Sequence, residues 1–457
     1  MRAAALLLAL LVAGCDLGPQ IDAPPPAAAP RFANAPADAP ASWPDPSWWR
    51  SFGSGELDAL VGAAAANNRN LLAATQRIAQ AEASARIAAS ALFPALQANG
   101  SVGRARSAGS ASRAVESNSF AASLAASYEV DLWRRVRSGV SAGEARVLSS
   151  RFDRDATALS ITAQTAVNYV NLLAVRDRLQ LARSTLAIAQ RILQVVLDQA
   201  RAGNASDLEV AQQQAAVAAQ QANLADLAGQ ERQALDAIGA VVGTRPDLAA
   251  VATNSLQALS VPAIPAGLPS ELLRRRPDIA KAEADFVAAG FDARAARAAR
   301  FPVLSLTGQG GLQSRDLSDF MTPERAAWSV GSALAAPLLQ GGRLAAGEDL
   351  AVARARELAE TYAQAILSAF QDVEDSLAAS VAAQQSFALR QTAYAAALRA
   401  YEIAEQRWRA GGADFLSVLQ AQQTAFATAD QLVQANLARF TAVIGVYRAL
   451  GGGWAAS

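Results

Sequence analysis

The fold of this chain is decided by a stretch that reads Phe301-Pro302-Val303-Leu304-Ser305-Leu306-Thr307-Gly308-Gln309-Gly310-Gly311-Leu312-Gln313. It follows an Ala- and Arg-rich helical pattern and begins at a proline. The residues then alternate, so that leucines fall on one face of an extended chain while Ser, Thr and Gln fall on the other. Alternation over about ten residues predicts a strand with one apolar and one wet face, and its length suits a tilted membrane-spanning strand.

The chain contains this junction between a helical pattern and an alternating segment twice. Phe93-Pro94 precedes a second alternating segment, and the two prolines, 94 and 302, are 208 residues apart. Two glycine-containing motifs repeat at the same separation, Arg201-Ala202-Gly203 and Arg409-Ala410-Gly411. The sequence therefore predicts an internal duplication, in which each copy carries one helix-to-strand junction and one helical tip.

Composition excludes several classes of function. Lys+Arg and Asp+Glu both number 40, and no basic stripe with interleaved aromatics indicates nucleic acid. The absence of histidine excludes His-based triads and most zinc and copper sites. Cys15 is the single cysteine, and nothing in the sequence organises Lys281, the only lysine, as a catalytic group. We therefore expect no enzyme, no metal and no cofactor.

The N-terminus predicts an exported, lipid-anchored protein. Residues 1–14 have a basic start and a short apolar run, as in a signal peptide, and end in small residues before Cys15. This pattern resembles a bacterial lipobox, so Cys15 is the expected lipidation site. Asp16 resembles an inner-membrane retention signal of enteric lipoproteins, which bears on sorting. Residues 15–55 are the expected lipid anchor and Pro/Ala-rich linker, ending in an aromatic cluster around Trp48 that we expect to pack against the body.

Residues 56–242 form the first expected repeat. Apolar spacing predicts a helix over Glu56–Leu92, which the following Phe93-Pro94 ends. Strands are expected at about 95–104 and 119–132, joined by a polar loop over Arg104–Asn118. A helix of roughly 70 residues then runs to about Ala202, and after a tip at about 202–206 a return helix runs to about Val242.

Residues 271–450 form the second expected repeat, after an irregular linker over 243–270. A helix over Leu272–Arg300 leads to strands at about 303–313 and 326–337. A second long helix runs to a tip at about 410–414 and returns to about Leu450, and residues 451–457 are the expected C-terminal tail. No run of 18 or more apolar residues follows the N-terminus, so we expect no transmembrane helix.

Counting strands predicts an assembly. One chain supplies about four strands, and an open sheet edge is not tolerated in lipid. The smallest transmembrane barrels have eight strands, so protomers must share one barrel. Three protomers would give about twelve strands and a pore, whereas two would give eight strands nearly filled by side chains.

The sequence resembles the TolC-like outer-membrane efflux factor family, in the lipoprotein (NodT-type) branch that partners resistance–nodulation–division pumps. The resemblance spans nearly the whole mature chain and is carried by these residues: Trp48-Trp49, Phe52, Leu57, Leu268-Pro269-Ser270-Glu271-Leu272-Leu273-Arg274-Arg275-Arg276-Pro277-Asp278-Ile279, Ala282-Glu283, Ala298, Phe301-Pro302, Pro337, Gly341-Gly342 and both tips. It implies a mainly α protein with a transmembrane β part, a homotrimer whose 12-stranded β-barrel continues into a periplasmic α-helical barrel. It also implies a periplasmic adaptor and an inner-membrane pump as partners, and a location in outer-membrane lipid.

The resemblance also implies the functional surfaces. In this family the tips meet the adaptor and the last helical turns narrow the tunnel. The candidate adaptor contacts are Arg201, Gly203, Asn204, Asp207, Arg409, Gly411, Gly412 and Asp414. The arginines favour contact, whereas the glycines are explained mainly by turn geometry. Family members often carry aspartates where Ser417 and Gln420 stand here, so we expect a constriction of Leu416 and Gln420 that is more apolar and hydrogen-bonded than ionic.

Three readings of function remain open from the sequence. The first is an export duct for drugs or other toxic small molecules. The second, within the same family, is the outer-membrane duct of a type I secretion system. The third is a lipid-anchored periplasmic scaffold without a pore, which would have no use for four alternating strands of membrane length. We expect Arg274, Arg275 and Arg276 to cap and pair structurally rather than to bind an anion.

Overall fold

The computed structural model describes residues 31–35, 43–108, 114–244, 251–264 and 269–454. Contacts divide the chain into two compact units. One, the strand unit, includes Gln76–Arg151 and Lys281–Gln364; the other, the helical unit, includes Pro26–Thr75, Phe152–Ala280 and Ala365–Ser457. The signal peptide, Cys15 and Asp16 lie outside the described residues.

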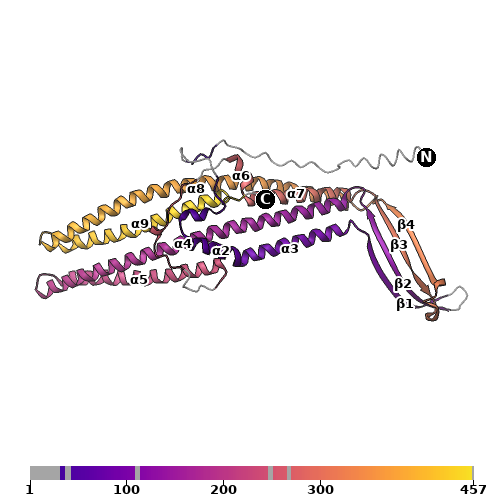
Figure 1. Cartoon of the computed structure of the whole chain (residues 1–457), viewed down its shortest axis with the longest axis horizontal. Helices are drawn as coiled ribbons and strands as arrows, with labels where there is room; N and C mark the ends of the chain where they lie inside the picture. The colour runs from indigo at the N-terminus through magenta and orange to yellow at the C-terminus, as the bar shows by residue number, and fades with distance from the viewer. Residues whose placement is uncertain (1–30, 36–42, 109–113, 245–250, 265–268, 455–457) are drawn as a thin grey trace. The chain divides into compact units, whose positions relative to one another are not determined.

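The strand unit holds one antiparallel sheet in the order β1-β2-β3-β4 (Figure 1). Its strands are β1 (Ala95–Ala108), β2 (Ala114–Val130), β3 (Val303–Ser314) and β4 (Ala326–Ala335). Leu124 faces Gly310 across the β2–β3 ladder, which joins the two halves of the sequence. Strands β1 and β4 each pair on one side only, so within one chain the sheet keeps two open edges.

The loop predicted over Arg104–Asn118 is mostly strand, and this prediction was wrong. The ladder continues through Arg104↔Asn118 and Arg106↔Glu116 as far as Ala108↔Ala114. Apolar alternation ends near Val102, but backbone pairing does not need it, and both arginines form ion pairs with Glu116 across the ladder. Two short 3-10 helices, η3 (Leu317–Asp319) and η4 (Pro323–Arg325), connect β3 to β4.

The register brings the large apolar residues of all four strands onto one face. These side chains are exposed in the single chain: Leu96, Val102, Leu124, Leu306, Trp328, Val330 and Leu334. A contiguous exposed apolar face of this kind marks an interaction with lipid or protein. Gly311 allows the close β2–β3 approach, because a Cβ there would lie 2.3 Å from the Ala122 carbonyl oxygen.

Each strand pair follows a helix and leads into a longer one. Helices α3 (Arg69–Ser90) and α7 (Pro277–Ala298) precede β1 and β3. At the second junction Trp133 stacks on Phe301, with ring centroids 4.9 Å apart, and its Nε1 donates to the Pro302 carbonyl at 2.8 Å. The residues that follow β2 therefore hold the start of β3.

Two long helical hairpins complete the fold. Helices α4 (Arg135–Arg201) and α5 (Asp207–Val242) form one, and α8 (Arg343–Arg409) and α9 (Phe415–Ala449) form the other (Figure 1). Among the described residues, only α4 contains a stretch long and apolar enough to cross a membrane. More than half of that stretch is buried within the protein, as in the core helix of a soluble protein.

The core of the helical unit joins residues from both hairpins and from the N-terminal segment. Tyr169 and Leu172 of α4, Ile238 of α5 and Phe440 of α9 belong to one buried cluster. The expected packing of the aromatic cluster is observed in the 3-10 helix η1 (Trp48–Phe52), where the Trp48 ring stacks on Tyr447 at 5.0 Å.

Two predicted helices are each broken in two. Glu56–Leu92 divides into α2 (Gly55–Asn67) and α3 around Asn68, which is 5% exposed. The Asn68 side chain donates to the Val241 carbonyl at 2.6 Å and accepts from the Leu71 N–H at 3.2 Å, so it caps α3 while bonding to α5. Such a break depends on a distant partner and has no strong local signal.

The second break falls at Arg276, between α6 (Pro269–Arg275) and α7. Pro277 restricts the residue before it and is favourable as the first residue of a helix, so the sequence Arg276-Pro277 marks an end and a start. The predicted linker over 243–270 also contains the 3-10 helix η2 (Leu256–Ala258) and the first residues of α6. In the predicted tail, Trp454 is packed: its Nε1 donates to Asp155 at 3.1 Å.

Candidate functional site

The first helical tip is built by two complementary caps. Gly203 has φ +75°, its N–H donates to the Ala200 carbonyl at 3.0 Å, and the Asn204 N–H donates to the Gln199 carbonyl at 2.8 Å. This pair of bonds is a Schellman motif, which satisfies the last carbonyls of α4 and requires glycine at the left-handed position. Ser206 then caps α5.

The second tip repeats the same backbone geometry. Gly411 has φ +77°, its N–H donates to the Trp408 carbonyl at 2.9 Å, and the Gly412 N–H donates to the Arg407 carbonyl at 2.8 Å. Asp414 caps α9 and accepts from the Ser417 N–H at 2.9 Å. Turn geometry accounts for Gly203 and Gly411, the two positive-φ glycines among the candidate residues.

The two caps carry the same chemistry in reversed order. At the first tip the hydroxyl of Ser206 caps the helix and the carboxylate of Glu209 accepts the Ser206 N–H at 2.6 Å, which makes a capping box. At the second tip Asp414 supplies the carboxylate and Ser417 the hydroxyl. The side chain and the backbone N–H of Ser417 hold the pKa of Asp414 below its ordinary value. Each return helix therefore begins with a negative charge, which stabilises the helix through its favourable interaction with the positive N-terminal end of the helix dipole.

The tip arginines present their guanidinium groups to the outside. Arg201 pairs with Asp198 at 2.6 Å and Arg409 pairs with Glu405 at 2.5 Å, each one turn back on its own helix. Their side chains are 69% and 54% exposed. A guanidinium has five donors, so one intrahelical pair leaves donors available to a partner. Asn204 and Asp207 are also exposed.

The two tips share one core, although their return helices start 208 residues apart. Trp408 and Phe415 of the second hairpin lie 5.7 Å apart, and their cluster includes Ile192 and Val196 of α4. Val210 of the first return helix packs against the same cluster. Burial raises the pKa of Tyr401 in this cluster to about 12, and the nearby Glu405 carboxylate adds to the effect. The tips are therefore fixed against each other by apolar packing.

The candidate constriction lies on an uncharged surface. Leu416 is 48% exposed and Gln420, one turn further along α9, is also exposed. Residues 415–429 of α9 contain no charged side chain, and neither do residues 210–225 of α5. The next charge on α9, Asp430, pairs with Arg178 at 2.6 Å. The exposed face at the start of α9 thus offers Leu, Ser, Gln and Thr rather than carboxylates.

Residues 32–34 of the N-terminal segment are held to helix α8. Phe32 is buried, with its ring 6.4 Å from that of Phe370. The Glu374 carboxylate accepts the N–H groups of Ala33 at 2.6 Å and Asn34 at 2.9 Å. Part of the predicted linker is therefore docked on α8, 17 residues after Cys15.

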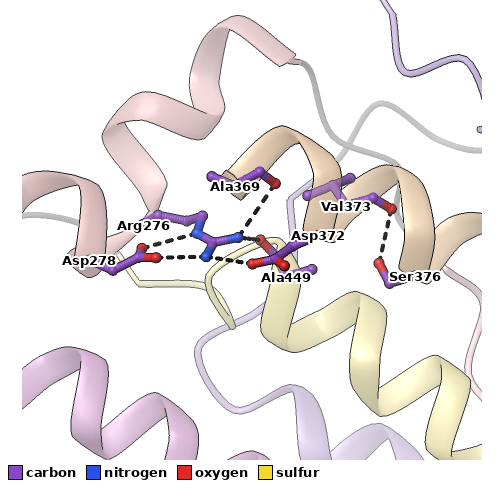
Figure 2. A network of polar contacts seen from close by, with 7 residues as sticks. All are labelled: Arg276, Asp278, Ala369, Asp372, Val373, Ser376 and Ala449. Carbon is purple, nitrogen blue, oxygen red and sulfur yellow. Dashed lines mark hydrogen bonds and ion pairs between the residues drawn. The ribbon is translucent and has the colours of Figure 1, made fainter. Parts of the chain in front are cut away.

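The three consecutive arginines separate into three environments, and Arg276 is the buried one. Its guanidinium bonds to Asp278 at 2.6 Å, to Asp372 at 2.9 Å and to the Ala449 carbonyl at 3.2 Å (Figure 2). Burial alone would lower the pKa of Arg276, but the two carboxylates outweigh it and the pKa is raised. Arg276 is saturated by protein groups and joins α7, α8 and the end of α9, so it holds the structure rather than an anionic ligand.

Arg275 pairs with Glu271 at 3.8 Å and lies 5.9 Å from the Trp43 ring, while Arg274 is exposed. No local pattern in the sequence marks Asp372 and Glu374 as functional, because their partners are distant in the chain. Among the described residues, no group of three or more His, Cys, Asp or Glu side chains could hold a metal ion.

Comparison with known proteins identifies relatives along the whole chain. The profile of a family described as "Outer membrane efflux protein" matches residues 60–244 and again residues 268–452. The two matches begin 208 residues apart, at 60 and 268, which is the separation of the repeated motifs. The duplication inferred from the sequence is thus the repeat of this family.

Named relatives and solved structures agree with that profile. The chain is 39% identical over 416 residues to the pyoverdine export outer membrane protein OpmQ of Pseudomonas aeruginosa, covering 89% of this chain and 87% of OpmQ. A structure of the outer-membrane channel OprN matches with a TM-score of 0.90 at 28% identity, over 96% of this chain and all of that one. The open state of the Neisseria gonorrhoeae MtrE outer membrane channel matches with a TM-score of 0.85 at 28% identity, over 96% of this chain and 98% of that one.

Proposed function

The chain belongs to the outer membrane efflux protein family, and we propose that it is the passive outer-membrane duct of a tripartite efflux system. Solved structures of this fold are described as outer-membrane channels. In the proposed system an inner-membrane pump supplies the energy and a periplasmic adaptor joins pump and duct. The chain itself performs no chemistry.

The observation that carries the proposal is the sheet with an exposed apolar face and two open edges. A four-stranded sheet in lipid must pair both edges, because unpaired N–H and C=O groups are costly in a bilayer. Joining β4 of one protomer to β1 of the next, three times, closes twelve strands with no edge. The alternate face, with Gln97, Thr307 and Gln309, then lines the lumen.

The helical tips are the proposed site of adaptor contact. The support is that Arg201 and Arg409 are exposed, hold free donor capacity and lie on a rigid, apolar-packed base. Asn204, Asp207 and Asp414 add polar groups beside them, while the glycines shape the turns. Leu416 and Gln420 are the proposed constriction of the trimer, on the uncharged start of α9.

Anchoring and cargo complete the proposal. Cys15 is the proposed lipidation site, and the docking of residues 32–34 on α8 supports a tether that ends on the body. Because Asp16 resembles an inner-membrane retention signal, separation of inner and outer membranes by fractionation tests in which membrane the protein resides. Because OpmQ is a pyoverdine export protein by name, we propose small organic solutes, siderophore-like molecules and drugs among them, as cargo.

The first test is deletion of the gene and complementation with barrel variants. Leu124 lies on the apolar face, so Leu124→Arg places a charge in lipid at about 2–4 kcal/mol. We expect loss of trimers from the outer membrane and accumulation of an efflux dye in the cells. Gln97→Arg, on the opposite face, is the matched control and should assemble.

This pair of variants also separates the alternative functions. A pore-less periplasmic scaffold would tolerate both changes equally, so equal activity of Leu124→Arg and wild type would contradict the duct. A type I secretion duct would instead lose export of a protein substrate while solute accumulation stayed unchanged in the deletion strain. The lipobox favours the pump-linked branch.

A further inference from the structure

One face of the β1–β2 hairpin is apolar near the start of β1 and becomes cationic toward the hairpin end. Leu96, Ala98, Gly100 and Val102 of β1 share one face, and the next two residues on that face are Arg104 and Arg106. The opposite face of the same rows holds only small side chains, among them Ala105, Ser117 and Ser119. The charge is therefore confined to the outward face.

The register sets the height of these arginines. From Val130 to Phe120, β2 spans ten residue steps, or about 23 Å along the membrane normal at a tilt of about 45°. This matches the apolar band of about 25 Å in outer-membrane barrels. Phe120 pairs with Val102 on one side and with Ser314, the last residue of β3, on the other, so this row marks the outer edge of the band.

Arg104 and Arg106 then stand about 5 and 9 Å above that edge, for the same tilt and rise. The headgroup layer on each side of a bilayer is roughly 5–8 Å thick. The outward face of the hairpin therefore changes from apolar to cationic at the level where lipid phosphates lie.

Within the described residues of the β1–β2 hairpin, the charges at this height do not cancel. Both arginines depend on one carboxylate: Glu116 lies 2.7 Å from Arg104 and 3.7 Å from Arg106. The arginine side chains are 74% and 71% exposed. By contrast, Arg325 of the β3–β4 connection has Asp319 as its own partner at 3.1 Å. At this height the described residues of the hairpin thus keep an excess positive charge on exposed arginines. The β3–β4 connection carries an excess negative charge instead, from Asp316, Asp319 and Glu324 against Arg315 and Arg325.

We propose that Arg104 and Arg106 bind the phosphate groups of the anionic glycolipid in the outer leaflet of the outer membrane. Guanidinium groups pair with phosphate through two parallel hydrogen bonds, which suits a ligand held at fixed height beside the barrel. A trimer presents three such pairs around its rim. Their function is to fix the depth of the barrel and to hold a shell of lipid around it.

The test uses full-length trimers reconstituted in phosphatidylcholine nanodiscs with labelled diphosphoryl lipid A as the probe. A cation near an anionic lipid surface changes lipid affinity about five-fold. Arg104→Gln/Arg106→Gln should therefore retain about 25-fold less lipid A than wild type, whereas Arg325→Gln, the paired control, should retain the same amount. Glu116→Gln should retain more, because the competing carboxylate is gone.

Two further arms complete the design. Dephosphorylated lipid A should bind wild type and the double variant equally, and inorganic phosphate should not displace the labelled lipid. Trimer bands on unheated gels establish that each variant is assembled. Equal retention by wild type and the double variant would overturn the proposal, as would displacement by inorganic phosphate or a fall in retention with Glu116→Gln.

Discussion

At the scale of single residues, Arg276 links three helices through hydrogen bonds and ion pairs. It is 8% exposed, and its guanidinium reaches two carboxylates on different helices together with the carbonyl of Ala449 at the end of α9 (Figure 2). A buried cation of this kind stabilises only while every donor is used, because an unpaired charge in the interior is costly.

Removing Arg276 should destabilise the folded chain strongly. Arg276→Ala leaves Asp278 and Asp372 without their cation. Because both carboxylates keep access to water, we expect a cost of about 1.5–3 kcal/mol, the range for a hydrogen bond to a charged group. We expect a lower Tm of the purified trimer, measured by circular dichroism, and Arg276→Lys should recover part of the loss. Arg274→Ala, a change at an exposed position, is the control; an equal Tm for the two alanine variants would contradict the role of Arg276.

The same group predicts how the helical unit responds to acid. Burial alone would raise the pKa of Asp278, but the hydrogen bond and charge of Arg276 outweigh it, so the pKa lies below its ordinary value. A depressed folded-state pKa contributes stability above the unfolded pKa of about 4 and loses it as pH falls through the folded value. We therefore expect a fall in Tm below about pH 4 that Asp278→Asn weakens. A wild-type profile and an Asp278→Asn profile with the same slope in this range would argue against the linkage.

At the scale of elements, the sequence predicted what is local and missed what is tertiary. The starts of β1 and β3 follow from a proline and an alternating pattern, and both tips follow from glycine. Residues 105–108 of β1 and 114–118 of β2 were missed because apolar alternation stops near Val102 while backbone pairing continues. The break at Asn68 was missed because its side chain bonds to Val241, 173 residues away. The break at Arg276 has a local signal in Pro277, which the predicted helix over Leu272–Arg300 did not take into account.

The candidate sites divide in the same way. The capping residues at the tips could be predicted from the sequence, because all the groups that form a helix cap lie within four consecutive residues. The shared apolar core beneath the two tips could not, because it joins residues of α4, α8 and α9 that no local pattern connects. The hydrogen bonds from residues 33 and 34 to Glu374 could not be predicted either, because more than 300 residues separate the partners.

Two glycines of β3, Gly308 and Gly311, offer a test of the sheet itself. A Cβ on Gly311 would lie 2.3 Å from the Ala122 carbonyl oxygen, whereas one on Gly308 meets nothing within 4 Å. Gly311→Ala should force β2 and β3 apart, at about 1–3 kcal/mol for overpacking. We expect fewer trimers in outer-membrane fractions on unheated gels, with Gly308→Ala close to wild type. Equal yields would show that the β2–β3 ladder shifts to admit the methyl group.

At the scale of the whole molecule, the proposed duct would be a property of a trimer and not of the single chain. One protomer supplies two helical hairpins and a sheet whose two edge strands, β1 and β4, each lack a partner on one side. The proposed constriction would form only where three copies of the start of α9 meet. That surface carries no charge over residues 415–429, so its resistance to ions should come from apolar side chains and width rather than from electrostatic repulsion.

The internal repeat supplies a control for the constriction itself. Leu416 and Leu208 occupy equivalent positions, 208 residues apart, and both are exposed in the single chain. If the second tip narrows the pore, Leu416→Ala removes three apolar side chains from the narrowest level, and single-channel conductance in planar bilayers should rise several-fold. Leu208→Ala should raise it less, and cation over anion selectivity should stay weak in both variants because no carboxylate is added or removed. No rise with Leu416→Ala would remove Leu416 from the constriction, and a rise with Leu208→Ala alone would move the constriction to the first tip.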